Sequence, residues 1–258
     1  MVELVATRLC ANSGSAALVS NASLELRAGQ LTVILGANGA GKTSLMRMLA
    51  GVMMPTSGTV SVKGLDLKAM SVTQRARYIS YLPQSVELAW GISVYDCVSL
   101  GRFAWGGAPG RLSAGDERAV QLALQQCGLA KLQSRSCLTL SGGELARVHC
   151  ARAFAADTPL LLVDEPVAAL DPKHQVQTMH LIEERVKDGV SALVILHDLN
   201  LAAQFADRLI WMREGQIISD GKVEETMTQA RISEVYGVQS LISGHQDRLN
   251  VVISGLDQ

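Results

Sequence analysis

The sequence predicts an α/β fold with a mostly parallel sheet, and two observations carry this prediction. Short apolar runs of strand length occur at Leu31–Leu35, 160–163 and 192–196, and segments of helical composition alternate with them. Strands that are apolar throughout are buried on both faces, which is typical of parallel strands covered by helices. The length of 258 residues allows one large domain or two small ones.

The expected elements divide the chain into three parts. The first 80 residues start with β-rich material and one helix, and short strands are expected at 4–9, 22–26, 31–35 and 59–63. From residue 93 to about 138 the pattern turns helical, and the strand–helix alternation then returns. Helices are expected at 42–50, 94–101, 116–127, 145–155 and 176–187. The tail from about residue 222 mixes short helical and strand-like pieces.

Composition excludes several classes of function. Lys and Arg number 23 against 24 Asp and Glu, so the net charge of -1 provides no field for nucleic acid or anionic lipid. No apolar run reaches the ~20 residues that cross a bilayer, and the N-terminus lacks the pattern of a signal peptide. Five cysteines without close pairing favour neither disulfides nor a metal clamp. We therefore expect a cytosolic protein that does not bind nucleic acid.

A glycine-rich loop follows the apolar run at Leu31–Leu35. It matches the pattern G-x-x-x-x-G-K-[ST] with Gly36, Ala37, Asn38, Gly39, Ala40, Gly41, Lys42 and Thr43. Its backbone N–H groups and the N-terminus of the next helix would cradle triphosphate oxygens. We expect Lys42 to reach the β- and γ-phosphates, Thr43 to bind Mg²⁺, and Ser44 to contact the phosphate nearest the ribose. Alone, this loop predicts nucleotide binding and leaves kinases, GTPases, helicases and transporter ATPases open.

Two adjacent carboxylates, Asp164 and Glu165, follow the apolar run at 160–163. They stand at the carboxyl end of a buried strand, where ligands bind in open α/β sheets. Because successive strand side chains alternate in direction, one can face Mg²⁺ while the other faces the water that attacks the γ-phosphate. We assign Asp164 to the metal and Glu165 to the role of general base.

A third motif carries a family resemblance. Residues 140–144 read Leu-Ser-Gly-Gly-Glu and, with 145–153, resemble the signature segment of ABC ATPases. The family's elements occur in their usual order over residues 31–200, namely the phosphate loop, Gln84, the signature, the acidic strand end, Asp171 and His197. The resemblance implies a P-loop NTPase fold with a mostly parallel core sheet, an N-terminal antiparallel β part and a helical insertion. It also implies a single domain, 1–258, in which 1–88 and 139–258 form the nucleotide-binding core and 89–138 the helical subdomain.

The signature makes physical sense as a second anion site. Ser141 supplies a hydroxyl, and Gly142 and Gly143 supply N–H groups at the start of a helix. One chain cannot fold both anion sites onto one ATP if the helical insertion lies between them. The resemblance implies a head-to-tail homodimer in which Ser141 and Gly143 of one subunit meet the γ-phosphate held by the other, so that two ATP molecules are sandwiched.

The resemblance also implies roles for three single residues. Gln84 would sense Mg²⁺ or the attacking water, Asp171 would communicate across the dimer, and His197 would contact the γ-phosphate and orient the water with Glu165. His149 and His174 carry no such implication, and we interpret both as structural. Cys150, inside the signature helix, is interpreted as a packing residue.

The chain carries one cassette and no membrane segment, which favours a separate ATPase subunit of an importer. Segments at 79–84, 98–102, 170–175 and 197–203 resemble the subfamily that serves iron–siderophore, haem and cobalamin permeases. This implies integral membrane permease subunits as partners, a substrate-binding protein as an indirect partner, and a peripheral place at the cytoplasmic face of the inner membrane. Ferric siderophore and haem are comparable as substrates, and cobalamin is an alternative. A soluble ABC ATPase of iron–sulfur cluster assembly would share every catalytic motif.

The chain departs from the family's pattern in two places. These ATPases usually place an aromatic residue near the end of the first strand to stack on adenine, yet the first aromatic residue here is Tyr78. We expect a residue at 10–12 to take that place, with weaker selection of the base. The sequence Val167-Ala168-Ala169 also stands where relatives often have a hydroxyl residue, which would alter communication across the dimer.

Overall fold

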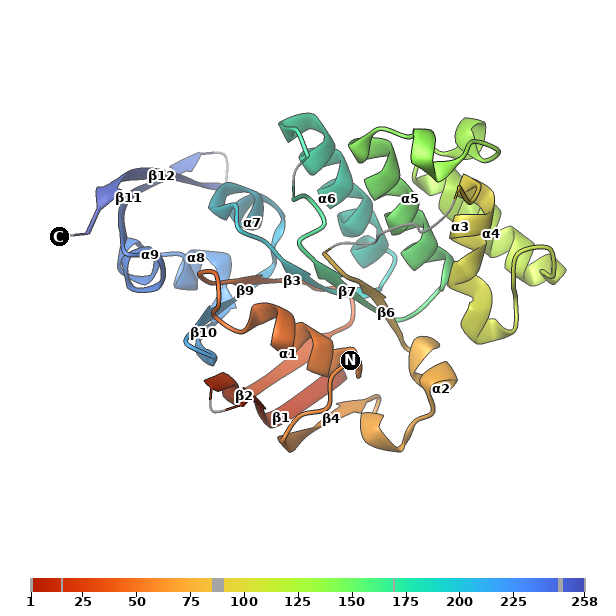
Figure 1. The fold of residues 1–258 in the computed structure, drawn as a ribbon. Helices are drawn as coiled ribbons and strands as arrows, with labels where there is room; N and C mark the ends of the chain where they lie inside the picture. Colours follow the sequence, from red (N-terminus) through yellow and green to blue (C-terminus); the bar gives the residue numbers. More distant parts are fainter. Residues whose placement is uncertain (1, 15, 85–90, 169, 246–247, 258) are drawn as a thin grey trace.

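The computed structural model describes residues 2–14, 16–84, 91–168, 170–245 and 248–257 (Figure 1). Its centre is a six-stranded sheet in the order β10 (Gln216–Lys222), β9 (Arg208–Arg213), β3 (Leu31–Leu35), β8 (Ser191–Ile195), β7 (Leu160–Asp164) and β6 (Ile79–Leu82). All neighbouring pairs are parallel except β10 and β9. The mostly parallel sheet predicted from the apolar runs is confirmed.

A second, antiparallel sheet contains the N-terminal strands. Its order is β2 (Ala16–Arg27), β1 (Val2–Ser13), β4 (Ser57–Val62) and β5 (Leu65–Asp66). The helix α1 (Lys42–Leu49) lies between the two sheets, as Figure 1 shows. The N-terminal antiparallel part implied by the resemblance is therefore present.

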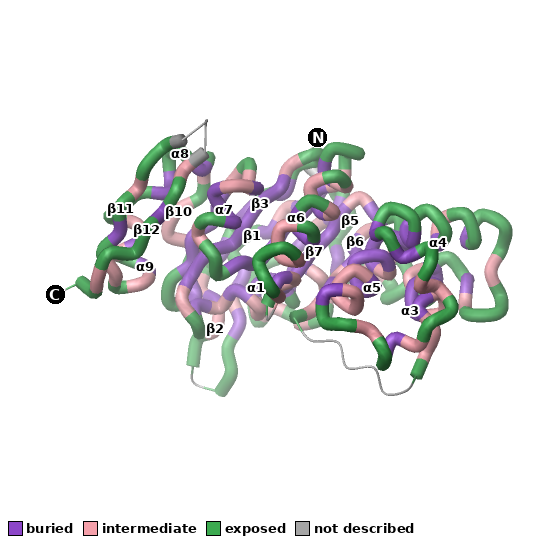
Figure 2. The backbone as a smooth tube through the Cα atoms, turned by 90° about the horizontal axis from the view of Figure 1, so that it is seen from above, coloured by how far each residue is buried: buried purple, intermediate pink, exposed green. Residues whose placement is uncertain are grey.

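The alternation of side chains along the central strands creates two hydrophobic cores. Leu160 and Leu162 of β7 face the core that α1 and the antiparallel sheet share. Leu161 and Val163 face the opposite core, which the other helices cover. Because both sets are at most 3% exposed, the strand is buried on both faces (Figure 2).

Helices cover the second face and form the insertion. The insertion contains α3 (Val94–Ser99), η2 (Leu100–Trp105), α4 (Ala114–Gln126), η3 (Ala130–Leu132) and η4 (Cys137–Thr139). The remaining helices are η1 (Leu67–Ala69), α2 (Val72–Ala76), α5 (Gly142–Ala155), α6 (Pro172–Lys187), α7 (Leu199–Phe205), α8 (Val223–Thr226) and α9 (Gln229–Tyr236). None of these described helices is both long enough and apolar enough to cross a bilayer. The expected boundary at 88/89 lies outside the described residues, and the division into core and helical subdomain stays a prediction.

The C-terminal region differs most from the sequence expectation. It ends in an antiparallel hairpin of β11 (Val238–His245) and β12 (Arg248–Leu256), which is separate from both sheets. Figure 1 places this hairpin beside α7 and α9, at the end of the molecule opposite the helical insertion. The sequence predicts only a mixture of short helical and strand-like pieces for this tail.

The cysteines agree with the packing interpretation. All five are free thiols, and Cys97, Cys127, Cys137 and Cys150 are buried. Burial raises the pKa of the Cys150 thiol to about 12, so it stays protonated at neutral pH. In the part of the chain that the structure describes, no three His, Cys, Asp or Glu side chains are grouped so that they could hold a metal ion.

Candidate nucleotide site

The phosphate loop connects β3 to α1 and leaves the start of the helix open. Gly41 is the N-cap residue with φ +93°, and no side chain caps the helix. A Cβ on Gly41 would lie 2.3 Å from the Leu18 carbonyl oxygen, and one on Gly36 would lie 2.5 Å from that of Met212. Only glycine fits at these two positions. The uncapped N–H groups of α1 therefore face the loop, where they can bind an anion.

Lys42 is buried under this loop. It is 5% exposed, and its Nζ donates to the carbonyl oxygens of Gly36 at 2.7 Å and of Ala37 at 3.0 Å. Burial lowers the pKa of Lys42, while the charges of Glu165 and Asp164 oppose that shift. The ammonium thus lies in its own loop, close to the carboxylates, within reach of a phosphate that enters.

A cavity of about 530 Å³ opens in front of the loop. Its lining contains Asn38, Gly39, Ala40, Gly41, Lys42, Thr43 and Ser44 of the motif, together with Leu18, Gln84, Glu165 and His197. Residues from five separate parts of the sequence therefore meet at one cavity. Leu18 contributes a large apolar side chain to this lining, whereas the expected residues at 10–12 are not among its described residues. The expectation that 10–12 replaces the aromatic residue is not supported.

Glu165 lies at the centre of a three-residue contact. One carboxylate oxygen, Oε1, is 2.5 Å from His197 Nε2, and the other, Oε2, accepts a hydrogen bond from Gln84 Nε2 at 2.6 Å. Glu165 adopts φ +51°, a left-handed conformation that costs an L-residue about 1 kcal/mol. A turn after β7, rather than the alternation of a strand, therefore directs this carboxylate into the cavity. Such strained conformations cluster at functional sites.

Asp164, the last residue of β7, is 1% exposed. Its Oδ1 accepts a hydrogen bond from Thr43 Oγ1 at 3.3 Å, whereas its Oδ2 is buried without a partner among the described residues. Burial is the main cause that raises the pKa of Asp164, and the nearby charge of Glu165 adds to the rise. An unpartnered carboxylate oxygen next to a hydroxyl suits Mg²⁺, which prefers oxygen ligands. The residues present fit the ion.

The signature segment forms the N-terminus of α5. Ser141 Oγ accepts a hydrogen bond from the Glu144 N–H at 3.3 Å, and the Ser141 N–H donates to Glu144 Oε2 at 2.9 Å. This reciprocal capping starts the helix at Gly142, three residues before the expected start. Ser141 and Gly142 are exposed, and none of the three signature residues Ser141, Gly142 and Gly143 is among the described lining of the nucleotide cavity. The structure therefore separates the signature from the phosphate loop of the same chain.

His174 connects the signature to Asp171, a link that sequence reasoning missed. Asp171 caps α6: it accepts from the His174 backbone N–H at 3.0 Å and lies 2.8 Å from the His174 ring Nδ1. These contacts hold the pKa of Asp171 below its usual value. A Cβ on Gly143 would lie 2.3 Å from the same ring. The spacing Asp-x-x-His after a strand end was the available signal.

His149 agrees with its structural interpretation. It is 8% exposed, its Nδ1 has no hydrogen-bond partner among the described residues, and burial lowers its pKa to about 4. It borders a cavity of about 250 Å³ that Gln84, Glu165 and Gly142 also line. The imidazole is therefore neutral at pH 7, on the side of the signature helix that borders the same cavity as Glu165.

Comparisons with known proteins agree on one family. Residues 19–168 match the ABC transporter family. The chain is 40% identical over 240 residues to the hemin import ATP-binding protein HmuV of Pseudomonas entomophila, covering 91% of this chain and 92% of that protein. It is 34% identical over 251 residues to HmuV of Bordetella avium, covering 94% and 95%.

Solved structures show the same fold. An ATP-binding cassette of an ABC transporter in its ADP conformation superimposes with a TM-score of 0.82 at 22% identity, over 92% of this chain and 98% of that one. A protein described as a metal-chelate type ABC transporter in an inward-facing conformation gives 0.84 at 21% identity, over 98% and 97%. The fold expected from the sequence is thereby confirmed.

Proposed function

Because the chain belongs to the ABC transporter family, we propose that it is the ATP-hydrolysing subunit of an importer for an iron chelate, and specifically for haem. The observation that carries the proposal is the placement of Glu165 between His197 and Gln84, at the edge of the cavity that the phosphate loop lines. The names of the relatives favour haem over ferric siderophore, since HmuV of two genera is a hemin import protein.

In the proposed mechanism, the residues of the cavity divide the work of hydrolysis. Lys42 exchanges its two loop carbonyls for the β- and γ-phosphates. Glu165 accepts the proton of the attacking water, and His197 holds that carboxylate in place and donates to the γ-phosphate. Thr43, Asp164 and Gln84 would hold Mg²⁺, which neutralises charge on the phosphate oxygens.

The signature completes the site from a second copy in this proposal. Ser141 and Gly142 are exposed and Gly143 is buried beside the His174 ring, and none of the three is among the described lining of the nucleotide cavity of its own chain. A head-to-tail homodimer would bring them to the γ-phosphate of the partner subunit, with Asp171 beside the interface. Two ATP molecules would then hold the closed dimer, and hydrolysis would release it.

Exposed apolar side chains near α2 support a permease contact. Phe103 and Val72 are each 72% exposed, and Met54 is 57% exposed. Two arginines join the α2 region to the segments that carry Met54 and Phe103. Arg75 donates to the Gly51 carbonyl, and Arg77 donates to the Ala104 carbonyl. We infer that this surface of the chain contacts the cytoplasmic side of the permease subunits. The chain would then lie peripherally at the inner membrane, and the substrate-binding protein would contact the permease only.

The test is co-purification of the tagged chain from detergent-solubilised membranes. We expect a polytopic permease to remain bound, and a Phe103→Ser variant to lose it. Leu122→Ser is the matched control, because Leu122 is 53% exposed on α4. In proteoliposomes with the binding protein, haem should stimulate ATP hydrolysis more than a ferric siderophore or cobalamin does. Exclusively soluble partners would contradict the importer and favour a role in iron–sulfur cluster assembly.

A further inference from the structure

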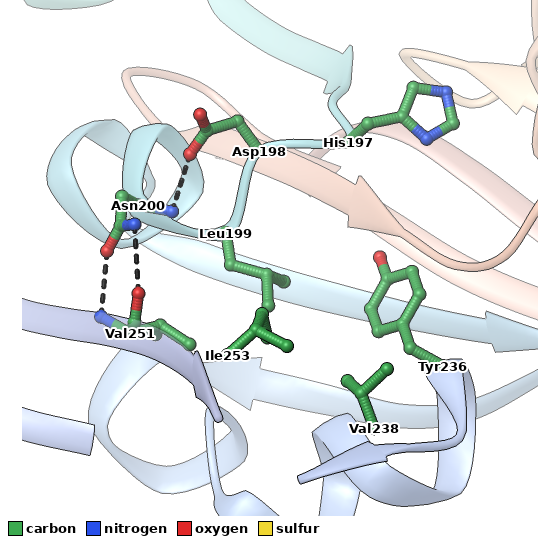
Figure 3. Close-up of a pocket in the computed structure, with 8 residues that line it drawn as sticks. All are labelled: His197, Asp198, Leu199, Asn200, Tyr236, Val238, Val251 and Ile253. Atoms are coloured by element: carbon green, nitrogen blue, oxygen red, sulfur yellow. Dashed lines mark hydrogen bonds between the residues drawn. The ribbon is translucent and has the colours of Figure 1, made fainter. Parts of the chain in front are cut away.

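One side chain of α7, Asn200, pairs with the backbone of the C-terminal hairpin. Its Nδ2 donates to the Val251 carbonyl oxygen at 3.1 Å, and the Val251 N–H donates to its Oδ1 at 2.7 Å, as Figure 3 shows. The amide therefore meets β12 as the backbone of a neighbouring strand would. Two hydrogen bonds from one planar group fix both the distance and the orientation of α7 relative to β12.

The same turn of chain carries His197. Asp198, the next residue, caps α7 by accepting from the backbone N–H groups of Asn200 at 2.7 Å and Leu201 at 2.9 Å. His197 is therefore joined to Asn200 through a capped first turn. Its own ring is exposed and has Glu165 as its hydrogen-bond partner. The position of the His197 loop thus depends on what holds α7.

The C-terminal region also reaches the phosphate loop, through Tyr236 at the end of α9, which borders a cavity of about 360 Å³. Residues 197–200 line one wall, and Tyr236, Val238, Val251 and Ile253 line the other. Figure 3 shows the Tyr236 hydroxyl pointing toward the His197 side of this cavity. That hydroxyl accepts a hydrogen bond from the Gly36 N–H at 3.1 Å. The C-terminal segment therefore touches the start of the phosphate loop and the loop of His197.

We propose that Asn200 is a positioning residue for ATP hydrolysis, because it ties the His197 loop to the hairpin and so keeps His197 at the Glu165 carboxylate. The inference rests on the proposed ATPase function. Asn200 lies outside the lining of the nucleotide cavity, so its loss should misplace His197 without removing a nucleotide contact. Misplacing a catalytic group lowers the rate of the chemical step rather than the affinity.

The experiment compares ATP hydrolysis by the purified full chain and by Asn200→Ala. We expect kcat to fall about tenfold while KM changes less than about twofold. Asn250→Ala is the matched control, because Asn250 is an exposed amide on the same hairpin, next to Val251 in sequence. It should hydrolyse ATP like the wild type. A purely structural role for Asn200 would instead lower the melting temperature and leave the kcat of the folded fraction unchanged.

A second variant guards against misfolding. Asn200→Asp keeps the size of the side chain and an acceptor for the Val251 N–H, but it faces the Val251 carbonyl with a second acceptor. It should lower kcat in the same direction. Wild-type kcat in both Asn200 variants, or an equal loss in Asn250→Ala, would overturn the inference. Absence of hydrolysis by the wild type would instead contradict the proposed function, so the two failures are distinguishable.

Discussion

The N-termini of α1 and α5 are both proposed to bind the same phosphate, yet they are built in opposite ways. That of α1 has no side-chain cap, and it opens into a cavity of about 530 Å³ lined by its own loop. That of α5 is closed on itself by the reciprocal contacts of Ser141 and Glu144, and it is exposed. The first needs a ligand to satisfy its N–H groups, whereas the second is stable without one. One open and one self-capped helix N-terminus are expected when the ligand first binds to one chain and a second chain then covers it.

The largest expected effect on ATP hydrolysis concerns the half of the site at α1, which a single chain supplies. Glu165→Gln keeps the size of the side chain and one acceptor oxygen, but it replaces the other carboxylate oxygen with an amide NH2 and so removes the proton acceptor. We expect ATP hydrolysis to fall at least about 100-fold, since general bases contribute this much, while ATP binding persists. Size-exclusion chromatography with Mg·ATP should show a dimer that wild type forms only transiently.

The matched control is Glu184→Gln, because Glu184 is 72% exposed on α6, outside the lining of the nucleotide cavity. It should hydrolyse ATP at the wild-type rate. Unchanged hydrolysis by Glu165→Gln would show that Glu165 is not the general base. The phosphate loop and its neighbours in the same chain would then bind ATP without supplying the base for hydrolysis.

A mixing experiment tests whether the second half acts in trans. Lys42→Ala and Ser141→Ala should each be inactive as homodimers. In a one-to-one mixture, each heterodimer contains one site with both residues intact, so activity should return to about one quarter of the wild type. Steady-state hydrolysis by the mixture measures this recovery.

The control mixture pairs Lys42→Ala with Glu165→Gln. Both residues line the cavity of one chain, so every heterodimer site lacks one of them and no activity should return. Equal recovery in both mixtures, or none in the first, would contradict a site shared between two chains. Because the Ser141 hydroxyl also caps α5, its loss should reduce stability by about 1 kcal/mol, which a thermal melt would detect.

The half of the site at α1 could be predicted from sequence because its determinants are local. The glycines, Lys42 and the strand before them are contiguous, and a buried strand that ends at Asp164 places this residue and the following Glu165 at the same sheet edge. The convergence of Gln84, Glu165 and His197 joins positions up to 113 residues apart, and only the family's order of motifs implied it. The left-handed backbone of Glu165 could not be predicted from the sequence. In a turn without glycine, tertiary contacts rather than the residue type decide which residue adopts a positive φ.

The C-terminal region was the least predictable part for a related reason. The exposed face of the hairpin carries apolar side chains such as Leu241 and Val252, and the inner face contains the buried Ser240, so the sequence lacks the regular apolar alternation of a half-buried strand. The C-terminal region is held by residues far away in the sequence: Asn200 pairs with Val251 of the hairpin, and Tyr236 of α9 accepts a hydrogen bond from the Gly36 N–H. Leu18 was missed likewise, since its place at the nucleotide cavity depends on how β2 passes Gly41.

The helices α1 and α5 each contain a buried basic side chain, and the two side chains differ in their hydrogen-bond partners. Lys42 has two carbonyl partners, whereas the Nδ1 of His149 has none among the described residues, and its pKa falls to about 4. An unfolded histidine titrates near pH 6.5, so the unfolded chain binds more protons between pH 6.5 and 4 and the fold loses stability as pH falls through that window.

His149→Gln should remove this loss. We expect the free energy of unfolding to drop by about 2 kcal/mol less than in the wild type between pH 7 and 4.5, measured by urea denaturation at both pH values. His180→Gln is the control, since His180 is exposed on α6 and pairs with Glu183. An identical pH dependence in wild type and His149→Gln would show that the imidazole is charged inside the fold.

The smallest expected effect concerns stability, and it compares how tightly the glycines of the phosphate loop and of the signature are packed. Gly36 and Gly41 of the first loop are crowded by backbone carbonyls, whereas Gly143 of the signature is crowded by the His174 ring. A side chain can move aside, so Gly143→Ala should destabilise the fold by only about 1–2 kcal/mol. Gly142→Ala is the control, because its Cβ would meet only Leu170 at 3.9 Å.

Adding His174→Ala to Gly143→Ala should remove the crowding. Denaturant unfolding of both single variants and the double variant gives the coupling energy between the two positions. A coupling near zero would mean that the ring already moves freely and that the signature is not tied to Asp171. A coupling of about 1 kcal/mol or more would mean that the exposed half of the site is held by His174 before any partner arrives. The signature would then be as preorganised as the phosphate loop, although it would be held by a side chain from another helix rather than by its own backbone.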